Sequence, residues 1–239
     1  MSNDLQKKYV REIEELAATA RLTDAKGFVT SQGGNLSYRV DEDVVLITPT
    51  KVAKRSVQFD DVCIVNMKGD VLYAAPGRKP TGEWPFHIRI MQKRPDVKAV
   101  LHAHPPVLTG FAITGQDYMQ RAYLPEPIIE VGPMMMVPYA EPLSDELAEK
   151  FDDYIEYSNG FLMENHGALM CSYESIGRAL ELLEMMEAAA QSIVVAVQLN
   201  AAKELSKQDI KNLDNVIKIR GLHMPGLPGK VNTLLDIYK

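Results

Sequence analysis

The sequence predicts an α/β domain in which helices flank a central, mainly antiparallel sheet. Short apolar runs rich in β-branched residues alternate along the chain with longer amphipathic stretches. Two pairs of these runs, 62–65 with 71–74 and 160–164 with 168–171, are separated by only a few residues. Because such short joins connect neighbouring strands that run in opposite directions, an antiparallel sheet is favoured.

Helices are predicted where apolar residues recur at a spacing of three and four. In chain order these stretches are 4–26, 81–93, 107–113, 144–157 and 174–203, with one more helical stretch after 207. Gly27 is expected to end the first helix. Thr81 and Ser144 are expected to cap the second and the fourth, because a side-chain hydroxyl can accept a hydrogen bond from a free N–H at a helix start.

Strands are predicted for the short apolar runs between these helices. In chain order they are 28–39, 44–48, 62–65, 71–74, 97–101, 160–164 and 168–171, with strand-like pieces around 128 and at 134–137. The pair Gly33-Gly34 interrupts the first run and, with Asn35, exposes N–H groups that could bind an anion, although such stretches are more often simple turns. No repeat or flexible linker is visible, so a single domain over residues 1–239 is expected.

The composition is that of a soluble globular protein, with 46% hydrophobic and 24% charged residues. A net charge of −6 and a pI near 5.4 argue against nucleic acid or a membrane surface as a partner. No apolar segment resembles a signal peptide or a membrane span. Cys63 and Cys171 lack metal or redox spacing, so buried thiols are favoured over a disulfide. These features predict a cytoplasmic protein.

Two histidines stand at the end of the strand predicted at 97–101. His102 and His104 are two residues apart and are followed by Pro105-Pro106. Because side chains of a strand alternate between its faces, both imidazoles point the same way and could form half of a metal site. A chance pair of unrelated histidines explains the pattern about equally well.

Glu83 and His166 could complete the site. Glu83 lies at the start of a predicted helix, and His166 lies in the turn between two predicted strands. With His102 and His104 they make three imidazoles and one carboxylate, a set that fits a divalent transition metal, most naturally zinc, with an open position for substrate. The absence of a thiolate from the set disfavours a closed structural site.

Six segments in this order resemble the class II aldolase and adducin family, most closely its fuculose-phosphate aldolase branch. They are Gly34-Asn35-Leu36-Ser37, Leu46-Ile47-Thr48-Pro49-Thr50, residues 80–87, residues 94–97, His102-Ala103-His104 and Asn165-His166-Gly167. The resemblance covers roughly residues 8–200 and leaves a C-terminal tail at about 207–239. It implies the three-layer class II aldolase fold and a ring-shaped homotetramer with active sites between neighbouring subunits.

The resemblance also implies a reaction. His102, His104 and His166 would bind Zn²⁺, or Mn²⁺ or Co²⁺, and Glu83 would alternate between metal ligand and acid or base. The reaction would be reversible cleavage of a phosphorylated ketose, similar to fuculose 1-phosphate, to dihydroxyacetone phosphate and an aldehyde. Relatives of this fold suggest a sugar-phosphate epimerase, a dehydratase or a decarboxylase as the alternative. A non-catalytic scaffold of the adducin kind is a remote one, because it has no need of the metal-binding set.

By the same resemblance, three loops would bind the phosphate of the substrate. They are Gly34-Asn35, Thr50-Lys51 and Thr81-Gly82. The family usually has glycine where Lys51 stands and two serines at 81–82. Lys51 either binds an anion, whether phosphate, sulfonate or carboxylate, or points to solvent, and the hydroxyl missing at Gly82 leaves the identity of the ketose open.

Two further side chains are left open by the resemblance. The family carries a histidine at the position of His87 that is not a metal ligand, so packing beside the site is expected. The fuculose branch supplies a tyrosine from a neighbouring subunit to protonate the aldehyde oxygen. Tyr123 and Tyr238 are in the right regions, but neither position can be matched to it.

Overall fold

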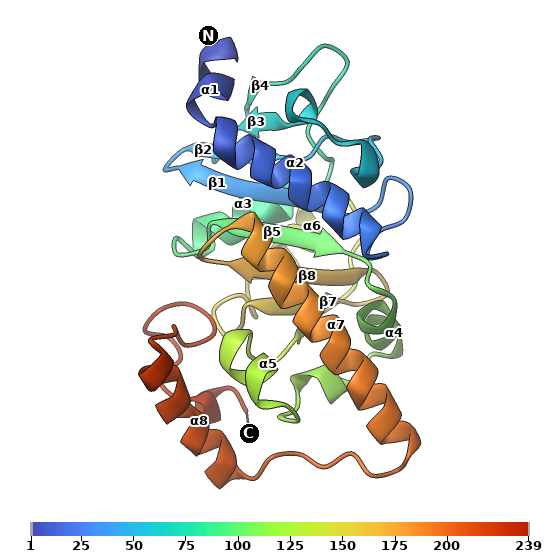
Figure 1. Cartoon of the computed structure of the whole chain (residues 1–239), viewed down its shortest axis with the longest axis vertical. Coiled ribbons are helices and arrows are strands. Elements are labelled where there is room, and N and C mark those ends of the chain that lie inside the picture. The colour runs from blue at the N-terminus through green and yellow to red at the C-terminus, as the bar shows by residue number, and fades with distance from the viewer. Residues whose placement is uncertain (1, 239) are drawn as a thin grey trace.

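The computed structural model describes residues 2–238 and contains one eight-stranded sheet (Figure 1). The strands lie across it in the order β4-β3-β2-β1-β5-β8-β7-β6. In chain order they are β1 (Asn35–Asp41), β2 (Val44–Ile47), β3 (Cys63–Val65), β4 (Val71–Tyr73), β5 (Ala99–Ala103), β6 (Met135–Val137), β7 (Gly160–Met163) and β8 (Gly167–Ser172). Every neighbouring pair is antiparallel except β6 and β7. The predicted mainly antiparallel sheet is confirmed.

Helices cover both faces of this sheet (Figure 1). On one face, α2 (Val10–Ala25), α4 (Pro106–Thr114) and α7 (Ile176–Gln198) share a buried apolar cluster with the strands. On the other face, α3 (Trp84–Lys93) and α6 (Asp145–Lys150) share a second cluster. The expected three layers, helices on either side of a central sheet, are therefore present.

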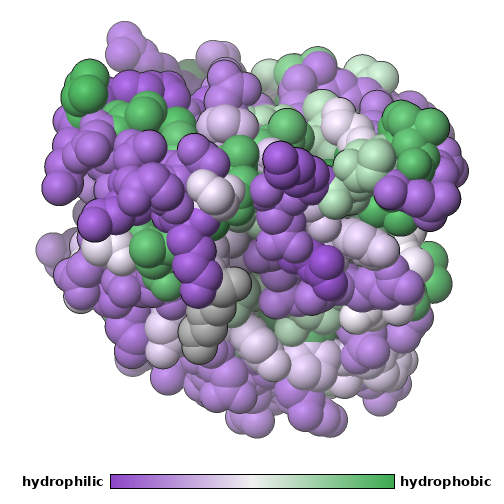
Figure 2. Space-filling view, turned by 90° about the horizontal axis from the view of Figure 1, so that it is seen from below, coloured by the Kyte–Doolittle hydropathy of each residue, from purple (hydrophilic) through white to green (hydrophobic). Residues whose placement is uncertain are grey.

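Four further elements lie outside these layers or at the ends of the chain. They are α1 (Ser2–Lys8), α5 (Pro125–Glu130), α8 (Lys207–Arg220) and the short 3₁₀ helix η4 (Leu234–Asp236). A third buried cluster joins α5, α8 and η4. The surface at this end of the molecule is mainly hydrophilic, with apolar residues in small separate groups (Figure 2). None of the helices within residues 2–238 is long and apolar enough to cross a membrane.

The alternation along β5 decides where its histidines lie. Leu101 and Ala103 belong to the cluster shared with α2 and α7, whereas Val100 belongs to the cluster shared with α3. His102 therefore faces α3, and its ring meets the edge of Phe86 with centroids 5.8 Å apart. The His-X-His pair thus sits between the sheet and the start of α3.

The strand predicted around residue 128 is wrong, because these residues form helix α5. Pro125 occupies the first turn of α5, where the missing backbone N–H costs no hydrogen bond. Ile128 and Ile129 are buried in the cluster with α8 rather than in the sheet. A short apolar run has no period that separates a strand from a buried helix, which is why the sequence misled us.

Other predicted elements exist with different bounds. The helix expected at 4–26 is divided at Tyr9, which is buried and donates its hydroxyl hydrogen to Asp41 Oδ2 at 3.0 Å. The first strand begins at Asn35, because residues 28–34 form a loop whose Phe28 carbonyl accepts from the N–H of His104 at 2.7 Å. The helix expected at 144–157 ends at Lys150, and the one expected at 174–203 spans only α7.

One of the two predicted caps is present. Ser144 Oγ accepts from the N–H of Leu147 at 3.1 Å, as expected for the start of α6. At the start of α3, Glu83 rather than Thr81 holds the cap position. Thr81 belongs to the preceding loop, because its N–H is bonded to the carbonyl of Thr48 at 3.0 Å. This loop pairing brings Glu83 to the edge of the sheet.

Candidate active site

The four predicted metal-binding residues come from three separate elements and meet at one place. His102 lies in β5, His104 directly follows that strand, His166 lies in the turn between β7 and β8, and Glu83 precedes α3. One ring nitrogen from each histidine lies within 4.8 Å of the others. The carboxylate of Glu83 lies 3.6 Å from His102 Nε2 and 3.5 Å from His166 Nε2.

The protonation of these rings fits a metal ion. His102 Nδ1–H donates to the carbonyl of Ala168 at 3.0 Å, which leaves the lone pair on Nε2. Burial and the neighbouring imidazoles lower the pKa of His102, and burial lowers the pKa of His104 to about 4. Neutral imidazole is the form that binds a metal.

Two further observations are compatible with a cation at this site. The Nε2 atoms of His102 and His104 lie 3.1 Å apart, so two lone pairs would repel unless a proton or a cation lies between them. The Nδ1 atom of His166 is buried and has no hydrogen-bond partner among residues 2–238. Three imidazole nitrogens and a carboxylate are a fitting donor set for a divalent metal.

The turn that carries His166 depends on its two neighbours. Asn165 has a φ of +54°, in the left-handed region that asparagine tolerates better than most residues. A Cβ atom at Gly167 would lie 2.5 Å from His104 Cδ2 and 2.7 Å from the carbonyl oxygen of Ala103. Only glycine therefore allows β8 to approach the His-X-His pair so closely, which accounts for the Asn-His-Gly segment.

A chain of buried hydrogen bonds holds Glu83 from behind. Asn35 Nδ2 donates to Glu83 Oε2 at 2.7 Å, and Asn35 Oδ1 lies 2.5 Å from His87 Nε2. His87 Nδ1 lies 2.7 Å from Ser37 Oγ. Burial lowers the pKa of His87 to about 3, so the ring is neutral. His87 then donates from Nε2 to Asn35 and accepts from the Ser37 hydroxyl at Nδ1, which fixes the amide orientation of Asn35.

The three loops expected to bind an anion lie side by side. The N–H of Thr48 bonds to the carbonyl of Leu36 at 3.0 Å, and the N–H of Thr50 bonds to the carbonyl of Lys79 at 2.9 Å. With the bond between Thr81 and Thr48, these contacts join the start of β1 to the loops at 48–51 and 79–82. Binding of an anion by these loops stays a prediction.

Individual residues of these loops differ in what they can contact. The Asn35 amide is turned toward Glu83. Lys51 is exposed and has a φ of +59°, the conformation that glycine adopts most easily, which explains why glycine usually stands there. Thr81 is buried, while Gly82 is exposed and faces Leu143, whose Cδ2 would lie 2.9 Å from a Cβ atom at position 82.

The sequence missed Lys54, which is 2% exposed. Its ammonium group donates to the carbonyls of Gln32 at 3.1 Å and Val52 at 3.3 Å. Lys51 and Lys54 are three residues apart in a polar stretch, and no sequence pattern shows which one is buried.

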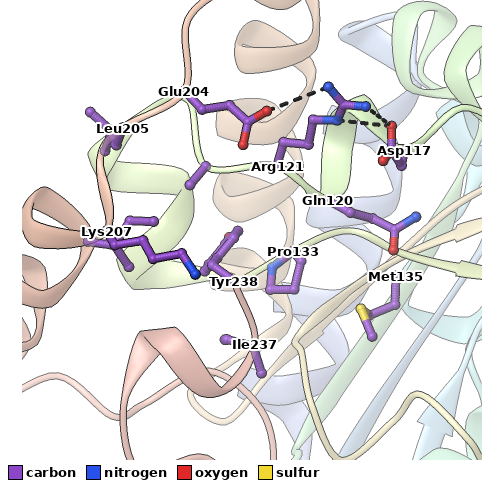
Figure 3. A pocket seen from close by; sticks show the side chains of 12 residues that line it. Asp117, Gln120, Arg121, Pro133, Met135, Glu204, Leu205, Lys207, Ile237 and Tyr238 are labelled. Carbon is purple, nitrogen blue, oxygen red and sulfur yellow. Dashed lines mark hydrogen bonds and ion pairs between the residues drawn. The ribbon is translucent and has the colours of Figure 1, made fainter.

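Tyr238 is buried in its own chain rather than exposed on the C-terminal tail. It lines a cavity of about 390 Å³ between the tail, α8 and Arg121 (Figure 3). The Arg121 guanidinium pairs there with Asp117 at 2.7 Å and with Glu204 at 3.5 Å. None of the four predicted metal-binding residues lines this cavity. Burial raises the pKa of Tyr238, so its hydroxyl is a poor proton donor in this position.

Residues 14–194 match the sequence model of the class II aldolase and adducin N-terminal domain. The chain belongs to the class II aldolase and adducin family. This family membership agrees with the resemblance in the motifs, including the likeness to fuculose-phosphate aldolases.

Relatives within the family carry out more than one reaction. The chain is 28% identical to a 3-oxo-tetronate 4-phosphate decarboxylase of Haemophilus influenzae over 193 residues, covering 80% of this chain and 90% of the relative. It is 30% identical to an L-fuculose phosphate aldolase of Methanococcus maripaludis over 180 residues, covering 75% of this chain and 94% of the relative. The class II aldolase superfamily is therefore clear, while aldol cleavage and decarboxylation both occur among its similar members.

Solved structures show the same fold. YgbL of Escherichia coli, whose name leaves aldolase, epimerase and decarboxylase open, matches with a TM-score of 0.77 and 25% identity, over 84% of this chain and 96% of that one. An L-fuculose 1-phosphate aldolase matches with a TM-score of 0.76 and 23% identity, over 87% of this chain and 96% of that one. The second likeness supports the fold only.

Proposed function

We propose that this protein is a divalent-metal-dependent lyase that breaks a carbon–carbon bond in a small phosphorylated ketose, in the manner of an aldolase. The convergence of His102, His104, His166 and Glu83 carries the proposal. These residues would hold the metal, with zinc favoured and manganese or cobalt possible. The bound metal would polarise the substrate carbonyl and stabilise the negative charge that develops when the bond breaks.

Glu83 is the residue proposed to move the proton. Its carboxylate lies among the histidines, and the Asn35 amide holds one of its oxygens at 2.7 Å. The other oxygen, Oε1, can turn toward a reacting carbon, either to take a proton or to return one. Gly34, Thr50, Lys51, Thr81 and Gly82 remain proposed substrate-binding residues together with Asn35.

Decarboxylation of a phosphorylated keto acid is the second candidate. Relatives that are 28% identical are named 3-oxo-tetronate 4-phosphate decarboxylases. Loss of CO₂ and aldol cleavage both leave negative charge next to a carbonyl, so one set of residues can serve either reaction. Decarboxylation releases no aldehyde, and so needs no acid at an aldehyde oxygen.

A homotetramer with active sites between subunits and a cytoplasmic location remain predictions. A neighbouring subunit would supply the acid for the aldehyde oxygen, since Tyr238 is buried beside Arg121 within its own chain.

The experiment that tests the proposal combines metal analysis with a substrate screen. Purified protein is loaded with Zn²⁺, Mn²⁺ or Co²⁺ and incubated with ketose 1-phosphates and with 3-oxo-tetronate 4-phosphate. Both reactions can release dihydroxyacetone phosphate, so release of an aldehyde with it would support aldol cleavage, and release of CO₂ would support decarboxylation. If the loaded protein retains only a small fraction of one equivalent of divalent metal per chain, both reactions are contradicted.

His104→Ala is the matched variant for this experiment. We expect it to lose metal and activity together, because one of three nitrogen ligands is removed. Metal content is measured by mass spectrometry on protein whose circular dichroism matches the wild type. Full metal content in His104→Ala would count against the proposed ligand set.

A further inference from the structure

Lys54 is a buried cation with no anionic partner. Its side chain is among the most buried in the molecule, and its ammonium group contacts two backbone carbonyls. No carboxylate among residues 2–238 lies within 4.0 Å of Nζ. Burying a charge without a counter-charge is unfavourable, so such a residue points to a ligand that supplies the missing charge.

We propose that Lys54 is the counter-charge for the anionic end of the substrate. This inference rests on the proposed lyase function and names the residue that selects an oxyanion, which can be a phosphate, a sulfonate or a carboxylate. The anion would bind on the loops that surround Lys54, with the ammonium group directly beneath them.

The two carbonyls that hold Lys54 belong to these loops. Gln32 directly precedes the Gly33-Gly34 pair, and Val52 directly follows Lys51. The ammonium group therefore joins two of the three loops expected to bind the anion. It has three hydrogens, and two are directed to these carbonyls, which leaves one for a further acceptor.

Lys54 also lies close to the proposed metal-binding residues. A Cβ atom at Gly33, next to Gln32, would lie 3.1 Å from the ring of His104. A substrate with a carbonyl at the histidines and an oxyanion a few atoms away could reach both.

The electrostatic surroundings of Lys54 agree with a role as the counter-charge of an anion. Burial lowers the pKa of Lys54 to about 8, although Asp24 and Glu83 both act to raise it. A buried ammonium acts on a nearby anion through a medium of low dielectric, so its charge is felt more strongly than that of an exposed group. Lys51 is exposed, so water screens its charge more than that of Lys54.

Inorganic phosphate is the probe for the first test. Its dissociation constant is measured by calorimetry on the full-length, metal-loaded protein, with sulfate and malonate in parallel to separate the oxyanions. We expect Lys54→Met to raise the dissociation constant by about 10- to 100-fold, the usual effect of one hydrogen bond to a charged group. Lys54→Arg should keep most of the affinity. Lys68→Met, the control at an exposed lysine outside these loops, should stay within about twofold of the wild type.

Lys54→Gln decides the test if Lys54→Met fails to fold. Glutamine can donate to both carbonyls without carrying a charge, so the loops keep their contacts. Phosphate affinity of Lys54→Gln within twofold of the wild type would overturn the proposal. So would a wild type that binds none of the three anions.

Kinetics separate this inference from the proposed function. In an active enzyme, Lys54→Gln should raise KM at least tenfold and change kcat less than threefold, because the anion is remote from the reacting atoms. Protein that binds phosphate through Lys54 but cleaves no substrate would contradict only the proposed function. Active protein with an unchanged KM in Lys54→Gln would contradict only the inference.

Discussion

Each end of helix α3 buries an ionisable side chain, and the two side chains differ in how many hydrogen-bond partners they have. At the C-terminal end, Arg94 is 1% exposed. Its guanidinium makes two hydrogen bonds to Asp96, at 2.9 and 2.7 Å, and others to Asn159 and to backbone carbonyls, including that of Gly226 at 2.9 Å. At the N-terminal end, Glu83 is 7% exposed, and its carboxylate lies 3.6 Å from the His102 ring and 3.5 Å from the His166 ring.

The difference distinguishes a structural cluster around Arg94 from the proposed active site around Glu83. The partners of Arg94 lie in its own loop, in residues 155–159 and in the C-terminal tail, and they use its donors fully. Glu83 has one strong partner, Asn35, and in the neighbouring His166 ring the Nδ1 atom has no hydrogen-bond partner within the described part of the chain. Closed networks of buried polar groups stabilise a fold, whereas open ones mark the place of a missing group.

The largest effect is expected at the N-terminal end. Glu83→Gln should lower turnover by about 10²- to 10⁴-fold, the usual contribution of a general acid or base. The urea midpoint should stay close to that of the wild type, because glutamine still accepts from Asn35. Both are measured on metal-loaded protein. Near-normal turnover would show that another residue moves the proton.

Arg94→Met should have the reverse signature. Removing the guanidinium leaves Asp96 and several buried carbonyls without a partner, which is expected to cost about 3–5 kcal/mol of unfolding free energy. Urea denaturation of wild type and variant at pH 7 measures it, and Lys93→Met at the exposed neighbouring position is the control. A loss below about 1 kcal/mol would mean that the two ends of α3 do not differ as described.

The smallest effect, counted per pH unit, is the loss of stability in acid. His87 has a native pKa of about 3 and an ordinary value of 6.5, so the unfolded chain binds the extra proton between these pH values. Stability should therefore fall as pH drops from 6.5 toward 3, by about 1.4 kcal/mol per pH unit for this one group. Urea denaturation of wild type and His87→Gln from pH 7 to pH 4 isolates it. Equal slopes in both proteins would contradict a buried neutral His87.

The family and the proposed metal-binding set could be predicted from the sequence. The spacing of His102 and His104 on a strand puts both rings on one face whatever the rest of the chain does, because the alternation is a property of the backbone. Glu83 and His166 stand in segments whose local chemistry, a helix start and a tight turn, is visible in the residues themselves. Membership in the class II aldolase and adducin family follows from those same segments.

Only the tertiary structure decided which groups are buried and what they face. It showed that Lys54 is enclosed while Lys51 is exposed, that Asn35 turns its amide to Glu83, and that the apolar residues around 128 form a helix against α8. Burial and hydrogen-bond orientation arise from contacts between segments far apart in the chain. Local sequence patterns carry no record of those contacts, which is why the meeting of the three histidines with Glu83 could be predicted and the burial of Lys54 could not.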